Sequence, residues 1–159
     1  YEKQGKINAG FSPLIGITMS LKKGISLNIR SNYNRSLNIR PSGLTLQVEK
    51  TLSASTSYSH KGGFTIPLPL MDDWNIQNNM NFTLNFDMNE NETFASGNNV
   101  DLTQQAFTSG WKTGLRISYS FSRNVTGGLI YEYRESNSKT TGRKIDRDFG
   151  FDINIAISG

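Results

Sequence analysis

The segment that decides the fold is 25-ISLNIRSNYNRSLNIRP-41, in which apolar and polar residues alternate. From residue 25 to residue 33 every odd position is apolar except Ser31, and every even position is Ser, Asn or Arg. Alternation with a period of two residues is the pattern of a β-strand that has one face in an apolar environment and one in water. The sequence therefore predicts a long strand over 25–40 whose two faces meet very different surroundings.

The same alternation covers most of the 159 residues, while the spacing typical of helices is nearly absent. We predict an all-β fold of long antiparallel strands that run up and down, with no domain boundary within 1–159. The seven predicted strands are 7–21, 25–40, 44–60, 74–90, 109–121, 125–136 and 146–158.

The predicted connections differ between the two ends of the sheet. Those at 22–24 and 122–124 are short turns, whereas 91–108 and 137–145 are longer, polar and rich in turn-forming residues. Short turns on one rim and longer loops on the other are typical of bacterial outer-membrane barrels.

The connection at 61–73 has a pattern of its own. It contains Pro67 and Pro69, which lack the backbone N–H that a central strand donates. We interpret it as an extended connection or an edge strand.

Charged residues are absent from the apolar face over a minimum length of about ten residues. On the strand over 25–40 the first charge on that face is Arg35, ten residues after Ile25. The same separation recurs from His60 to Lys50, from Val125 to Glu135 and from Ile157 to Arg147, and the strand over 74–90 stays uncharged for longer, from Trp74 to Met88. Because a tilted strand of about ten residues crosses the hydrocarbon core of a bilayer, we interpret this length as a membrane crossing.

Aromatic residues mark both ends of this length, as in the girdles of outer-membrane barrels. We expect Tyr58, Trp74, Tyr119 and Phe121 near the rim of short turns, and Phe11, Tyr33, Trp111, Tyr131, Tyr133, Phe149 and Phe151 towards the other rim. Together with Ile25, Leu27 and Ile29 they form the predicted lipid-facing side.

The opposite face of these strands is strongly polar. We predict that it lines an aqueous channel, with Asn28, Arg30, Asn32, Asn34, Asn81, Asn85 and Asp87 in its wall. Small barrels pack their interiors with side chains, so a wall this polar is tolerable only against water. Since seven strands cannot enclose a wide lumen, we predict an arc of a larger transmembrane barrel.

Few residues offer catalytic or metal-binding chemistry. The chain has no Cys and one His, His60, so we predict no catalytic site, metal or cofactor and no enzymatic activity. Asp87, Asn89 and Asn91 have the spacing of a calcium loop, but the sixth position is Glu92 instead of Gly, so we interpret the segment as a solvated loop.

The net charge is only +4, and the basic residues are too scattered along the chain for a nucleic-acid-binding surface. A basic cluster, Lys139, Arg143, Lys144 and Arg147, falls in or beside the predicted loop at 137–145. It could contact anionic lipopolysaccharide or simply be solvated.

Several segments, in order, resemble the C-terminal region of the SprA/Sov family. They are SPLIGI (12–17), KGI (23–25), NRSLNI (34–39), IP (66–67), NFTLNFD (81–87), IYE (130–132) and FGFDI (149–153). The family forms the outer-membrane translocon of type IX secretion and gliding motility. The closing residues 157–159 depart from it, because they lack the terminal aromatic residue that barrel assembly favours, and we expect the chain to be a piece of a longer protein.

The resemblance implies a very large barrel in the bacterial outer membrane through which folded cargo proteins pass. It also implies partners: the rest of the parent barrel, a PorV-type shuttle barrel, a periplasmic plug protein, secreted cargo, membrane lipid and lipopolysaccharide. Two alternatives stay open, namely another outer-membrane barrel (a nutrient-uptake receptor or a lipopolysaccharide exporter) and a soluble β-rich adhesin or carbohydrate-binding module.

Overall fold

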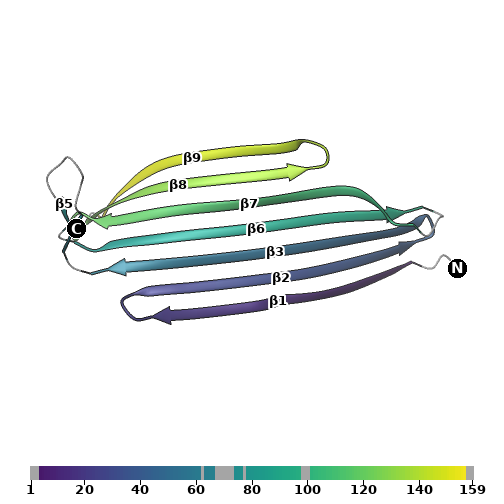
Figure 1. Cartoon of the computed structure of the whole chain (residues 1–159), viewed down its shortest axis with the longest axis horizontal. Coiled ribbons are helices and arrows are strands. Elements are labelled where there is room, and N and C mark those ends of the chain that lie inside the picture. The colour runs from purple at the N-terminus through teal and green to yellow at the C-terminus, as the bar shows by residue number, and fades with distance from the viewer. Residues whose placement is uncertain (1–3, 62, 67–73, 77, 98–100, 157–159) are drawn as a thin grey trace.

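The computed structural model describes residues 4–61, 63–66, 74–76, 78–97 and 101–156. In this part of the chain seven antiparallel strands form one open sheet, and two short strands form a separate hairpin (Figure 1). The predicted all-β, up-and-down arrangement of seven long strands is confirmed. None of the described residues forms a helix that is long and apolar enough to cross a membrane.

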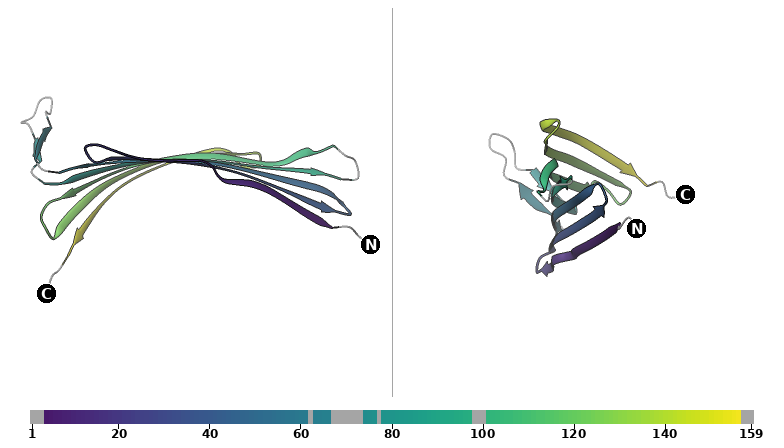
Figure 2. Two further views of the ribbon diagram at one scale, coloured as in Figure 1. Left: turned by 90° about the horizontal axis from the view of Figure 1, so that it is seen from below. Right: turned by 90° about the vertical axis from the view of Figure 1, so that its right-hand side faces the viewer.

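Strands that are consecutive in the sheet are neighbours along the chain, apart from the inserted hairpin. The order is β1-β2-β3-β6-β7-β8-β9, with β1 at Gly5–Leu21, β2 at Ile25–Arg40, β3 at Gly43–His60, β6 at Met80–Ser96, β7 at Thr103–Ser120, β8 at Val125–Ser138 and β9 at Gly142–Ile155. Seen edge-on, the sheet is a single, strongly twisted layer (Figure 2). It therefore has two faces and two edges, the edges being β1 and β9.

Two predicted loops are wrong, because the strands continue through them. β6 ends at Ser96 and β7 begins at Thr103, so most of the predicted loop at 91–108 is strand, and β8 and β9 likewise absorb most of 137–145. The predicted contrast between short turns and long loops is lost with them. The reason is that strand pairing needs only backbone hydrogen bonds. Polar residues can therefore continue the paired strands beyond the apolar segment.

Glycines allow the tight connections at this rim. Gly43 has φ +135°, and a Cβ atom there would collide with the carbonyl oxygen of Ser96 on the neighbouring strand. Gly142, at the β8–β9 turn, has φ +69° but open space around it. Gly43 thus permits both an unusual backbone conformation and a close approach of β3 to the end of β6.

The connection between β3 and β6 contains the separate hairpin. β4, at Phe64–Ile66, pairs with β5, at Trp74–Ile76, so residues 74–76 belong to this hairpin and not to the start of β6 as predicted. Alternation alone cannot reveal this, because it does not say which strand is the partner. Pro67 and Pro69 lie outside the described residues.

We predict that Gly43→Ala destabilises the sheet by at least about 1–2 kcal/mol, because an L-residue in this conformation is strained and its Cβ collides with backbone. The measurement is urea unfolding of the chain in detergent micelles. Gly142→Ala is the matched control, since it shares the positive φ without the collision and should cost less. Equal effects of the two substitutions would contradict the role given to the contact with Ser96.

Candidate functional site

The cross-strand register places the apolar positions of all seven strands on one face. The row of directly opposed residues that contains Ile25 runs Leu21, Ile25, Tyr58, Phe82, Ile117, Leu129 and Phe151. Among the described residues only Leu46 and Met80 are buried hydrophobic side chains, and Leu84, on the central strand β6, is 45% exposed. The apolar face is therefore continuous and largely exposed.

Charged residues on this face form a boundary that slants across the sheet. Measured along each strand from the row of Ile25, the first charge comes after ten residues on β2, eight on β3 and β6, six on β8 and four on β9. These charges are Arg35, Lys50, Glu90, Glu135 and Arg147, while β7 carries no charge on this face. The boundary thus moves in one direction from β2 to β9.

The slope of this boundary follows from the spacing of a β-sheet. Five steps between strands at about 4.8 Å cover about 24 Å, and a fall of six residues at about 3.4 Å covers about 20 Å. The boundary is therefore inclined by about 40° to the perpendicular of the strands. The other end of the zone, where the strands begin, slants in the same direction. β2 begins in the row of Ile25, whereas β8 begins at Val125, four residues before its own member of that row, Leu129.

On β2, β3, β6 and β8 the charge-free zone has the same length, although both of its ends slant. On β6 it runs from Met80 to Glu90, again ten residues, because the strand begins at Met80 and not at Trp74. β2, β3 and β8 give the same value, as predicted. On β9 the predicted end, Ile157, lies outside the described residues.

Aromatic side chains line the boundary on its apolar side. Tyr33, Tyr133 and Phe149 each lie two residues before the charge on their own strand, and Phe11 is opposite Tyr33. The ring of Trp111 is 4.8 Å from that of Tyr133, and Arg147 lies 5.7 Å from the same Tyr133 ring. Tyr131 and Phe151 lie two residues further from the charges on their strands.

The other end of the zone also has aromatic residues. Tyr58 stacks on Phe82 at 6.1 Å, and Tyr119 meets Phe121 edge-on at 5.0 Å. Trp74, predicted to lie near this rim, is in β5, whose side chains are outside the described part. Sequence reasoning missed Phe82, because its place in this row is visible only once β6 is paired with β3.

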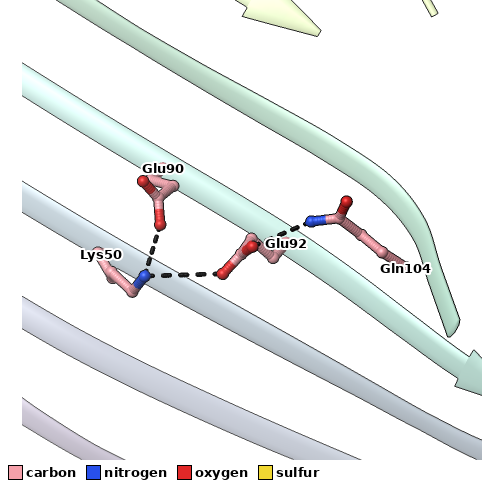
Figure 3. A network of polar contacts seen from close by, with 4 residues as sticks. All are labelled: Lys50, Glu90, Glu92 and Gln104. Atoms are coloured by element: carbon pink, nitrogen blue, oxygen red, sulfur yellow. Dashed lines mark hydrogen bonds and ion pairs between the residues drawn. The ribbon is translucent and has the colours of Figure 1, made fainter. Parts of the chain in front are cut away.

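At the boundary the charges on β3 and β6 pair with one another (Figure 3). The Lys50 ammonium donates a hydrogen bond to Glu90 and lies 3.6 Å from Glu92, and Gln104 donates to Glu92 at 3.0 Å. The hydrogen bond to Glu90 raises the pKa of Lys50 above its ordinary 10.5. Sequence reasoning missed Glu90 and Glu92 as boundary residues, because their position depends on the register with β3.

The residues of the predicted basic cluster interact with different neighbours. Arg143 donates two hydrogen bonds to Glu135, at 2.7 and 3.0 Å, and this interaction lowers the pKa of Glu135. Lys144 pairs with Asp146 at 3.1 Å, and Lys139 donates to the carbonyl of Gln104 at 2.6 Å. The four basic residues therefore do not form one open cationic patch.

The residues predicted to line a channel share the face opposite the apolar one. Rows across β2, β3 and β6 join Asn28 to Ser55 and Asn85, Arg30 to Ser53 and Asp87, Asn32 to Thr51, Asn34 to Glu49, and Ser59 to Asn81. Hydrogen bonds between uncharged side chains link the strands. Asn32 Nδ2 donates to Thr51 Oγ1 at 2.9 Å, and the Ser26 and Ser57 hydroxyls are 2.7 Å apart. This half of the polar face is thus dominated by amides and hydroxyls.

The other half of the polar face, on β7–β9, is more highly charged. Arg116 on β7 reaches Asp152 on β9 at 3.2 Å, across the intervening strand. Gly128 on β8 leaves room for this bridge, since a Cβ atom there would lie 2.6 Å from Asp152 Oδ1. On the apolar face the adjacent Gly127 opens a hollow of about 420 Å³ beside Tyr119, Phe121 and Ile153.

None of the described residues forms a cluster of three His, Cys, Asp or Glu side chains that could hold a metal ion. Asp87, Asn89 and Asn91 lie within β6, so their interpretation as a solvated loop is wrong. Their side chains point to one face of a strand, where alternate positions are too far apart to wrap an ion as a loop does.

The fold and its faces thus define a class of structure: an open antiparallel sheet with one apolar and one polar surface. Comparison with models of known protein families finds no match to the chain, and comparison with curated proteins finds no related sequence.

We predict that Lys50→Glu destabilises the sheet by about 1 kcal/mol, since it places a third carboxylate against Glu90 and Glu92. Exchange of the pair, Lys50→Glu with Glu90→Lys, should recover part of the loss in urea unfolding. Lys22→Glu, in the β1–β2 turn, is the control. Because the pKa of Lys50 is raised, the interaction contributes fully at neutral pH and is lost as pH rises past 10.5 and through the raised value. A Lys50→Glu chain as stable as the original would contradict this account.

Proposed function

We propose that the chain is an arc of the wall of a larger outer-membrane β-barrel, with its apolar face towards lipid and its polar face towards a wide aqueous lumen. The slanted boundary carries this proposal. Strands of outer-membrane barrels tilt by about 35–45°. A boundary inclined by about 40° to the perpendicular of such strands lies level with the membrane surface.

The composition of the apolar face supports a lipid environment. A charge-free height of about ten residues matches one crossing of the hydrocarbon core by a tilted strand. Tyr33, Trp111 and Tyr133 lie at its edge, where amphipathic aromatic rings prefer the membrane interface. Charges then begin on β2, β3, β6, β8 and β9, at the level where lipid headgroups and water would start.

A soluble module is less consistent with the same features. A soluble sheet would bury its apolar face against a second layer. Nothing in such packing requires the charges to fall on a sloping line, or to lie ten residues from the other end of the zone on each of β2, β3, β6 and β8. The polar face favours a wide lumen, because uncharged amides such as Asn28 and Asn85 recur along it where a small barrel would place packed side chains.

Within outer-membrane barrels we propose a protein-conducting translocon of type IX secretion and gliding motility. The support is the resemblance to the SprA/Sov family. In this role the chain acts without catalysis: its polar wall borders a passage for folded cargo, alongside a PorV-type shuttle barrel and a periplasmic plug protein. A nutrient-uptake receptor or a lipopolysaccharide exporter would have the same kind of barrel wall but would not transport folded proteins.

We predict that Leu84→Arg destabilises the folded chain in phospholipid vesicles by about 2–4 kcal/mol, because it places a charge at mid-height on the lipid face of β6. Asn85→Arg, one residue away on the polar face, should cost less than about 1 kcal/mol, since its side chain meets water. Urea unfolding in vesicles gives both values. Folded chain that fails to float with the vesicles in a density gradient would contradict the membrane proposal.

The translocon proposal has a separate test. An antibody against the β8–β9 hairpin should detect, in outer-membrane fractions, a protein far larger than the 17.8 kDa of this chain. Photo-crosslinkers at Asn28 and Asn85 should capture secreted proteins, whereas crosslinkers at Leu27 and Leu84 should not. A free protein of 17.8 kDa in those membranes would exclude the translocon and favour a smaller membrane assembly.

A further inference from the structure

The two edges of the sheet differ in their suitability for pairing. β1 has a register shift between Phe11 and Ile15 and contains Pro13, which lacks a backbone N–H. β9 pairs with β8 without a shift from Val125 and Ile155 to Ser138 and Gly142, and it contains no proline. Bulges and prolines discourage the addition of a strand, so β9 is the better template.

An unbalanced charge lies on the polar side of the β9 edge. Asp148 is directly opposite Glu132 on β8. Glu132 has its own cations, Arg134 and, at 4.0 Å, Lys112, whereas Asp148 has no ion pair or hydrogen bond among the described residues. Like charges that face each other across a ladder are destabilising, so a cation on the outer side of Asp148 would relieve the repulsion.

The apolar side of the same edge is the most exposed part of the apolar face. Phe149 and Phe151 are 74% and 73% exposed, more than any other large hydrophobic residue among those described. A strand beside β9 would cover them laterally, as β8 covers the other side. One neighbouring strand could therefore both neutralise Asp148 on the polar face and cover Phe149 and Phe151 on the apolar face.

We propose that the outer edge of β9 pairs with an antiparallel strand that carries Lys or Arg opposite Asp148 and apolar residues opposite Phe149 and Phe151. The inference goes beyond the proposed function, because it specifies the chemistry and register of a neighbour. Only the exclusion of a second, inverted copy rests on the proposed membrane setting.

A second copy of this chain does not fit the β9 edge. The seven strands alternate in direction, so β1 and β9 run the same way, and β1 of a second copy would pair with β9 in parallel. Antiparallel pairing of two β9 strands would turn one copy upside down, with its charge boundary at the opposite level. The neighbour is therefore a strand from a different segment or protein.

The test uses the full chain in detergent micelles and a synthetic peptide that alternates Val and Thr, with one Lys on its polar side. The chain has no natural Cys, so Gly150→Cys, a position with open space for a Cβ atom, provides one thiol two residues from Asp148 on the same face. A peptide Cys two residues before its Lys should form a disulfide with Cys at position 150, because antiparallel strands run in opposite directions. A peptide Cys two residues after its Lys should not.

Asp148→Asn should weaken binding of the Lys peptide by about twofold to fivefold, the effect of one cross-strand charge pair. Asp87→Asn is the matched control, since Asp87 lies on the same face but on the central strand β6, and binding should be unchanged. Replacing the peptide Lys by Glu should weaken binding to the original chain.

Three results would overturn the proposal: disulfides in the parallel register, equal binding of the Lys and Glu peptides, or hydrogen-exchange protection of β1 instead of β9. These outcomes are independent of membrane insertion. A chain that floats with vesicles but binds no peptide refutes only the β9 neighbour, and one that binds the peptide but stays out of lipid refutes only the membrane proposal.

Discussion

The backbone ladder between neighbouring strands is the constraint on which the rest of this structure depends. Side chains alternate between faces, so a slip of one residue on any strand would move its apolar set to the polar face. The sheet has almost no core to correct such a slip. Its register is held instead by long ladders and by cross-strand pairs such as Asn32 with Thr51 and Lys50 with Glu90.

Much of this could be predicted from the sequence, because alternation is a local signal. It identified all seven long strands and assigned Asn28 and Ile29 to opposite faces, and it placed charges such as Arg35 and Lys50 ten residues from the strand ends. The ends of strands were harder to predict. In β6 and β7 the polar residues beyond the boundary have the composition of a loop, yet they continue the ladder to Ser96 and from Thr103.

The slope of the boundary could not be predicted, because it is a property of the pairing between strands and not of any one strand. Each strand separately shows only its own uncharged length. The register reveals that Lys50 and Glu90 are opposite one another, while Glu135 lies two residues and Arg147 four residues closer to the row of Ile25. The same holds for Gly127 and Gly128, whose importance comes from the residues that approach them from other parts of the chain.

The near absence of a core changes what stabilises such a sheet. With only Leu46 and Met80 buried among the described hydrophobic residues, burial within the sheet contributes little. In the proposed membrane setting lipid shields the backbone hydrogen bonds of the charge-free zone from water on one face of the sheet, and these bonds become the main source of order.

Beyond the boundary, on the side of Arg35, water competes for those backbone bonds. On the apolar face the charged pairs between strands, such as Lys50 with Glu90 and Arg143 with Glu135, lie there. The boundary thus separates two modes of stabilisation. In the proposed membrane setting this difference explains why the strands continue as paired strands beyond the ten or so residues that one crossing needs.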